Sequence, residues 1–247
     1  MIQYSLAMKK VSLFTTAFLL LGFSFINCSQ QNPESENVWV DLFDGETFNG
    51  WKMYGTDSDE ISTKWEIEDG MIIASRDGDG PGINTGFDKS LMTVNQFENF
   101  ELELEFRNSS GGNSGIMYHV IEDSTSAMDY FTGHEFQILD DYHFANQVRE
   151  FQYTASVFAL YPAGPKTLHP AGEWNKVRIK VDNGKTEHWL NDELVLEYDR
   201  NSEEYDSTYQ ASQWVNFPNW GKTQNGHFSL QDHGDMIAFR NIRIREL

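Results

Sequence analysis

The sequence is poor in several residue types, and each shortage argues against a class of protein. A single cysteine among 247 residues rules out an internal disulfide. Only 18 lysine and arginine residues stand against 38 aspartate and glutamate residues, for a formal net charge of −20. Nucleic acid is therefore not an expected partner, because phosphate groups bind to clustered positive charge. No segment shows a long apolar period of 3.6 residues, and beyond residue 26 no apolar run is long enough to span a bilayer. These shortages favour an acidic, strand-rich protein that handles neutral ligands.

The first residues have the pattern of an export signal. Lys9 and Lys10 precede the apolar run 11–26, which ends close to Cys28. We expect residues 1–27 to be a signal peptide and Cys28 to carry a lipid that attaches the protein to a membrane. Cleavage and release is the alternative, because the residues just before Cys28 are not small. Residues 28–38 would then be a lipidated flexible tether and residues 39–247 the folded domain of an exported lipoprotein, in the periplasm or at the outer membrane.

The sequence from Trp39 onward is a series of short strands separated by glycine, asparagine and aspartate turns. Residues 100–106 alternate strictly between apolar and acidic side chains, as a strand with one buried face does. Two hairpins are expected, with tight turns at 69–70 and 191–192. The pattern predicts an all-β, single-domain sandwich of two antiparallel sheets, of the jelly-roll type. The strands are expected at residues 65–75, 100–106, 115–122, 134–139, 154–161, 176–182, 187–199, 227–232 and 236–247.

The stretch 134–139 gives its two faces different chemistry. Phe136 and Ile138 alternate with Glu135 and Gln137. In a curved sandwich the apolar pair would face the core, while the carboxylate and the carboxamide would line a groove on the other side. Alternation alone is equally compatible with two solvent-facing side chains.

Two glycine-containing turns carry further polar candidates. The segment GGNSG at 111–115 contains Asn113 and Ser114, which could hydrogen-bond to a sugar, although a plain connecting turn fits as well. The segment LQDHGD at 230–235 places His233 between two carboxylates. This arrangement suits an acid/base pair and also an ordinary polar turn.

Two other patterns admit both a functional and a structural interpretation. Glu101, Glu103 and Glu105 share one strand face, as the paired carboxylates of jelly-roll glucanases do, but they also suit a solvated outer face. Trp214 and Trp220 lie in an aromatic loop that could stack on sugar rings or could close one end of the sandwich.

The sequence contains no recognisable metal or cofactor motif. The seven histidines include no pair at the spacing of a helical zinc site. A divalent cation held by Asp140, Asp141 or Glu135 is the alternative that these carboxylates leave open.

Five blocks of the chain resemble, in order, the 3-keto-disaccharide hydrolase family, which is common in Bacteroidota. The resemblance covers about residues 39–247, and the blocks are LFDGETFNGWKMYG (42–55), FELELEFRNSSGGNSGIMYHV (100–120), GHEFQILDD (133–141), PAGEWNKVRIKVDNGKTEHWLND (170–192) and FPNWGKTQNGHFSLQDHGDMIAFRNIRIREL (217–247). It implies a concanavalin A-like jelly roll, an exported and often lipidated protein, and cleavage of glycosides or disaccharides whose sugar is oxidised to a ketone at carbon 3.

The resemblance also implies a mechanism and a set of residues. A ketone at carbon 3 acidifies the proton on carbon 2, so a base can remove it, the aglycone can leave carbon 1, and water can add to the double bond. The family's arginine after the Asn-Ser-Gly turn is absent here. By this resemblance Glu135 acts as base or holds a cation, His233 is its acid/base partner, and the sugar is bound by Arg107, Asn113, Ser114 and Gln137.

Two other classes of function stay open at this point. A lectin-like module would bind ordinary sugar and release no product, since one fold serves both uses. A conventional glucanase using Glu101, Glu103 and Glu105 would cleave unoxidised glycans directly.

Overall fold

The computed structural model describes Met1 and residues 38–56, 58, 60–74 and 90–247, and within these residues the strands form two antiparallel sheets. The expected signal peptide, the lipid site Cys28 and the tether up to residue 37 lie outside the described residues. No helix among the described residues is long and apolar enough to cross a membrane.

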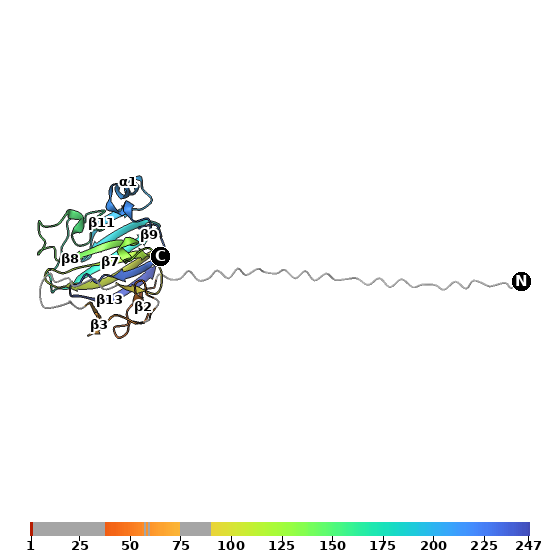
Figure 1. The fold of residues 1–247 in the computed structure, drawn as a ribbon, viewed down its shortest axis with the longest axis horizontal. Helices are drawn as coiled ribbons and strands as arrows, with labels where there is room; N and C mark the ends of the chain where they lie inside the picture. The colour runs from red at the N-terminus through yellow and green to blue at the C-terminus, as the bar shows by residue number, and fades with distance from the viewer. Residues whose placement is uncertain (2–37, 57, 59, 75–89) are drawn as a thin grey trace, which may run out of the picture. The chain divides into compact units, whose positions relative to one another are not determined.

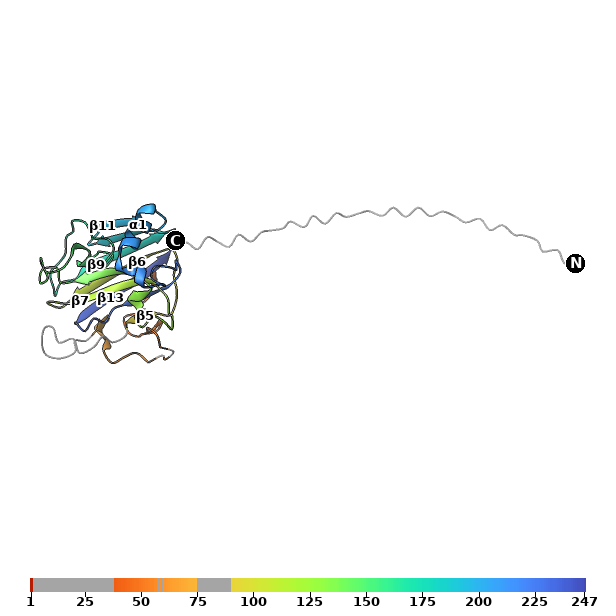
Figure 2. The same cartoon turned by 45° about the horizontal axis from the view of Figure 1, so that its top comes forward.

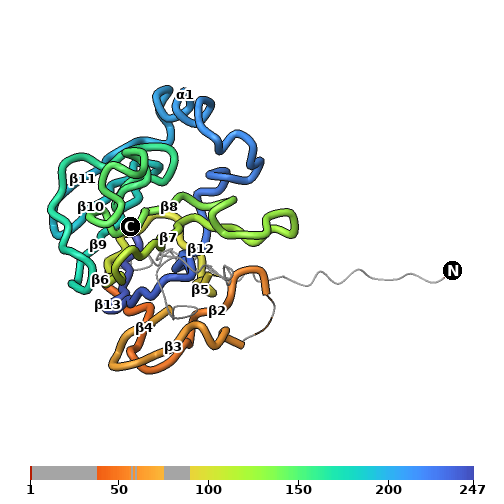
Figure 3. The backbone as a smooth tube through the Cα atoms, turned by 60° about the vertical axis from the view of Figure 1, so that its left-hand side comes forward, coloured from red at the N-terminus to blue at the C-terminus, as the bar shows by residue number. Residues whose placement is uncertain are grey.

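The larger sheet has eight strands in the order β11-β10-β9-β6-β13-β4-β3, with β1 paired to β13, and the smaller has five in the order β2-β5-β12-β7-β8. Figure 3 shows the two layers side by side, with the larger sheet on the left and the smaller on its right. The larger sheet comprises β1 (Val40–Asp41), β3 (Trp65–Glu68), β4 (Met71–Ala74), β6 (Phe100–Asn108), β9 (Asn175–Asp182), β10 (Lys185–Leu190), β11 (Glu193–Asp199) and β13 (Ile237–Glu246). The smaller comprises β2 (Trp51–Met53), β5 (Leu91–Thr93), β7 (Asn113–Val120), β8 (His134–Leu139) and β12 (His227–Leu230).

The core lies between the inner faces of the two sheets, as the alternating pattern predicts. On β6, Phe100, Leu102, Leu104 and Phe106 are all buried in the main hydrophobic cluster, which also contains Phe136 and Ile138 of β8, and Figure 1 shows the sheets that enclose it. The turns at 69–70 and 191–192 form the expected hairpins, with positive φ angles at all four residues. The predicted jelly-roll sandwich is confirmed.

Residues 154–161 do not form the expected strand. They form a loop in which Val157 makes one isolated bridge to Phe136 and another, within the loop, to Tyr161. The left-handed backbone at Ala155 (φ 70°) and Ala159 (φ 57°) breaks the extended conformation. Sequence alternation could not reveal this, because the apolar side chains of the loop are buried against the sandwich much as strand side chains would be.

One helix was not expected from the sequence. Helix α1 (Glu203–Ala211) begins at Ser202, whose hydroxyl accepts a hydrogen bond from the Tyr205 amide at 3.0 Å, and three acidic residues occupy its first turn. Figure 2 shows it packed at the β11 end of the sandwich. Tyr205 is its only buried residue, so no apolar period marks it in the sequence.

Candidate functional site

Strand β8 places Glu135 and Gln137 on the face of the smaller sheet opposite the core. Neither side chain faces open solvent: Glu135 is 6% exposed and Gln137 is 3% exposed. Both line a cavity of about 190 Å³. The other lining residues come from four separate segments of the chain and are Asn113, Tyr130, Phe158, Gln231 and His233. Four residues that the sequence suggested, Asn113, Glu135, Gln137 and His233, therefore meet in one pocket.

A glycine on β7 makes room for the carboxyl of Glu135. Gly115 pairs with Gln137 across the two strands. A Cβ atom at position 115 would overlap the Glu135 side chain, with Cδ only 2.9 Å away. The Asn-Ser-Gly segment is thus more than a connecting turn, because its glycine lets the carboxyl lie flat across the neighbouring strand.

A chain of polar contacts links Glu135 to His233. The amide of Gln137 is satisfied when its nitrogen faces the carboxyl, where it donates to Glu135 Oε1 at 2.9 Å and to the Ser114 carbonyl at 3.0 Å. The Gln137 and Asn113 amides are 3.3 Å apart, and the Asn113 amide lies 3.1 Å from His233 Nε2. The two amides therefore hold a carboxyl and an imidazole in fixed positions in the same cavity.

Burial shifts the pKa values of Glu135 and His233, the two residues at the ends of this series of polar contacts. It raises the pKa of Glu135 to about 8, and the negative charge of nearby Asp129 adds to the effect. It lowers the pKa of His233. At neutral pH the carboxyl is accordingly protonated and the imidazole is neutral, so the cavity pairs a proton donor with a proton acceptor.

Asp129 lies beneath the cavity and is itself buried. It accepts hydrogen bonds from the Ser229 hydroxyl and, at 3.0 Å, from the Tyr130 amide. Burial also raises the pKa of the Tyr130 phenol, with further contributions from Asp129 and Glu135. Tyr130 therefore stays protonated, and it is one of the residues that line the pocket.

The structure places the other suggested sugar-binding residues away from this pocket. Arg107 lies on the outer face of the larger sheet, with its guanidinium 4.8 Å from the Trp174 ring centre. Ser114 faces the opposite side of β7 from Asn113 and donates to the Gln231 carbonyl at 2.8 Å. Trp214 and Trp220 are only 2% and 1% exposed and stack on each other, so they close one end of the sandwich.

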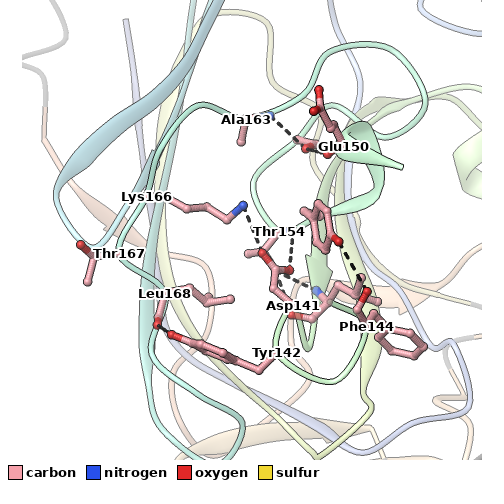
Figure 4. A network of polar contacts seen from close by, with 12 residues as sticks. Asp141, Tyr142, Phe144, Glu150, Thr154, Ala163, Lys166, Thr167 and Leu168 are labelled. Carbon is pink, nitrogen blue, oxygen red and sulfur yellow. Dashed lines mark hydrogen bonds and ion pairs between the residues drawn. The ribbon is translucent and has the colours of Figure 1, made fainter. Parts of the chain in front are cut away.

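Asp140 and Asp141 have structural partners. Asp140 accepts hydrogen bonds from the backbone amides of Gly111 at 2.9 Å and His143 at 3.2 Å. Asp141 accepts from Thr154 and pairs with Lys166 at 3.1 Å, which ties the 154–161 loop to the end of β8 (Figure 4). Within the described ranges, no three His, Cys, Asp or Glu side chains are grouped to hold a metal ion. The suggested metal ligand Asp140 therefore has no companion ligands in that part of the chain.

The three glutamates of β6 belong to a surface network of ion pairs. Each pairs with an arginine of β13 on the outer face of the larger sheet. Glu103 meets Arg243 at 2.6 Å and Glu105 meets Arg240 at 2.5 Å, and Glu101 meets Arg245. They are on the outer face of this sheet, but only partly solvated, since Glu101 is buried and the side chain of Glu103 is 12% exposed. They do not line the cavity that contains Glu135.

Tyr130 and Phe158 are pocket residues that the sequence analysis missed. Phe158 belongs to the segment mistaken for a strand, and its backbone amide donates to the Glu135 carbonyl at 3.2 Å. Tyr130 lies in a short 3₁₀ turn, Asp129–Phe131. No local pattern marks either residue, because both reach the pocket through tertiary contacts.

Comparison with known proteins adds the family context. A model of the 3-keto-alpha-glucoside-1,2-lyase-like domain matches residues 38–245. A 3-keto-disaccharide hydrolase of Bacteroides thetaiotaomicron is 36% identical over 241 residues, which cover 89% of this chain and 82% of the relative. A solved structure from Parabacteroides distasonis, provisionally described as a glycosyl hydrolase, has a TM-score of 0.73 at 30% identity and covers 85% of this chain and 94% of its own. A second structure from that organism, described in the same way, has a TM-score of 0.65 at 25% identity, with coverages of 85% and 100%.

Proposed function

Because the chain belongs to the 3-keto-alpha-glucoside-1,2-lyase-like family, we propose that its cavity cleaves glycosides whose sugar carries a ketone at carbon 3. The Bacteroides relative, a 3-keto-disaccharide hydrolase, supports this substrate class. The observation that carries the proposal is the buried chain from Glu135 through Gln137 and Asn113 to His233, which holds a proton donor and a proton acceptor in one cavity.

The protonation states favour His233 as the base and Glu135 as the acid. The neutral imidazole removes the proton from carbon 2, and the electrons of the broken C–H bond form an enediolate with the carbon 3 ketone. The bond from carbon 1 to the leaving oxygen then breaks, and the carboxyl of Glu135 protonates that oxygen. Loss of the leaving oxygen restores the carbon 3 ketone and leaves a double bond between carbons 1 and 2. The carboxylate of Glu135 then takes a proton from water as the hydroxyl adds to carbon 1, and the imidazolium of His233 returns its proton to carbon 2, so both residues regain their starting states and net hydrolysis results. This assignment of roles reverses the expectation from the sequence, in which Glu135 was the base.

Tyr130 is suited to stabilise the negative charge that develops during the reaction. Its phenol remains protonated and the residue lines the same cavity, which makes it the candidate donor of a hydrogen bond to the enediolate. Gln137 and Asn113 position the acid and the base relative to each other.

The activity is tested by incubating the purified domain with a 3-keto glucoside and, separately, with the parent glucoside, with and without chelator. Mass spectrometry should detect aglycone release from the keto substrate only, and the Glu135→Gln variant should release little. Loss of activity with chelator would add a metal ion to the site. Release from the parent glucoside would indicate a conventional glycosidase, and binding without release from either would indicate a lectin-like module.

The assignment of His233 as base and Glu135 as acid is tested by the pH dependence of the residual kcat/KM of the His233→Asn variant. The neutral imidazole does not contribute to the raised pKa of Glu135, which comes from burial and Asp129, so this pKa should persist in the variant. If Glu135 is the acid, residual kcat/KM should fall as pH rises through about 8. A rise through the same pH would assign Glu135 as the base.

We also propose that the protein is exported and carries a lipid on Cys28. The charged and apolar leader supports export, and the lone cysteine at its end supports lipidation. Metabolic labelling with a fatty acid should mark the wild-type protein and not the Cys28→Ser variant. Equal labelling of both would overturn the lipid assignment.

A further inference from the structure

A second and larger cavity lies beside the first. Its volume is about 530 Å³, against about 190 Å³ for the cavity with Glu135. Phe158 lines both cavities, so the two adjoin at this side chain. The larger cavity is built by the 149–160 segment and the end of helix α1, and its lining includes Arg149, Phe151, Gln152, Phe158, Ala211 and Gln213.

The sizes of the two cavities suit two parts of one ligand. Pockets that enclose a drug-sized ligand typically measure about 300–1,000 Å³. The smaller cavity is below this range and suits a single sugar ring, whereas the larger one falls within it. A disaccharide with its oxidised ring beside Glu135 therefore needs further space for its second ring, and that space lies across Phe158.

The lining of the larger cavity has the chemistry of a sugar site. Phe151 and Phe158 offer apolar rings on which the C–H face of a sugar can pack. Arg149, Gln152 and Gln213 offer side-chain groups that hydrogen-bond to hydroxyls. Arg149 is the only charged residue among the described residues that line it, which favours a neutral ligand.

The segment at which the two cavities adjoin is tied to the catalytic strand. The Phe158 amide donates to the Glu135 carbonyl at 3.2 Å, and the Ala159 amide donates to the Phe151 carbonyl at 3.3 Å. Ala159 also adopts a left-handed backbone with φ 57°, a conformation that persists only where its surroundings hold it. A group bound in the larger cavity would thus be held at a fixed position relative to the carboxyl of Glu135.

We propose that the larger cavity binds the leaving half of the substrate, namely the second sugar ring of a 3-keto disaccharide. This inference rests on the proposed function, and it assigns substrate preference to the 149–160 segment and helix α1. Contacts made to the leaving ring, remote from the reacting carbons, then help to position the scissile bond.

The test narrows the larger cavity and compares two substrates with the same oxidised ring. Ala211 lies at the exposed end of α1 and lines the cavity, so Ala211→Phe adds bulk there without disturbing the core. Gln210→Phe, at the neighbouring exposed position outside the cavity lining, is the matched control. The substrates are a 3-keto disaccharide and the methyl 3-keto glucoside, which has no second ring.

Ala211→Phe should lower kcat/KM for the disaccharide by about tenfold or more and leave the methyl glycoside within about twofold of wild type. Gln210→Phe should change neither. Unchanged turnover of the disaccharide by Ala211→Phe, or an equal loss with both substrates, would overturn the proposal.

A binding measurement separates this proposal from the proposed function. If the wild-type protein turns over neither substrate, the proposed function fails. The cavity is then tested by calorimetry on the Glu135→Gln background with the same two ligands. Weaker binding of the disaccharide alone in the Ala211→Phe protein supports the subsite, and equal affinity with and without that substitution overturns it.

Discussion

Replacing Glu135 by glutamine should make the protein more stable in alkaline solution and leave its stability almost unchanged in acid. The folded-state pKa of about 8 lies well above the ordinary value of 4.5, because the carboxyl is buried near Asp129. A raised folded pKa contributes stability that is fully present below pH 4.5 and is lost as pH rises through about 8. At about 1.4 kcal/mol per pH unit, the wild type loses up to about 5 kcal/mol over this range.

The glutamine variant has no carboxyl to ionise at this position, and its side-chain oxygen can still accept the hydrogen bond from Gln137. Urea unfolding of both proteins at pH 5, 6, 7, 8 and 9 measures the difference. Glu66→Gln, at an exposed position on β3, controls for the loss of one negative charge from an acidic chain. A difference between Glu135→Gln and wild type that stays constant from pH 5 to 9 would refute the argument that burial holds this carboxyl protonated.

Three further predictions concern the pocket around Glu135, the buried His188 and the outer face of the larger sheet. Gly115→Ala should push the Glu135 carboxyl aside and reduce kcat/KM for a 3-keto glucoside by about tenfold or more, and full activity in a folded variant would contradict this role. Burial lowers the pKa of His188 to about 4, so the wild type loses about 3 kcal/mol of stability as pH falls from 6.5 to 4. The destabilisation caused by His188→Gln, measured by urea unfolding, should therefore shrink by that amount between pH 7 and 4; a pH-independent difference would argue against it. Glu103→Gln should cost about 1 kcal/mol or less in thermal unfolding and leave turnover unchanged, because glutamine can still accept a hydrogen bond from the half-exposed Arg243 and lies outside the cavity with Glu135; loss of turnover would favour the glucanase alternative.

Much of the fold could be predicted from local sequence because strand alternation reports directly on burial. The strict pattern of 100–106 located β6 and its core face, and the turn residues at 69–70 and 191–192 located two hairpins. The failures occurred where tertiary contacts replace periodicity. The 154–161 loop has the composition of a strand, and α1 has a single buried residue.

The candidate site shows the same division. Strand alternation placed Glu135 and Gln137 on one face, and two glycine-containing turns suggested Asn113 and His233, whose roles came from the family resemblance; all four line one cavity. The tertiary structure was needed to show that the face with Glu135 and Gln137 is covered and that Arg107 lies on the larger sheet. The physical reason is that alternation specifies which side chains share a face. What covers that face, and so whether a carboxyl there keeps its proton, depends on segments outside the strand, 129–131 and 154–161, which the alternation within 134–139 does not specify.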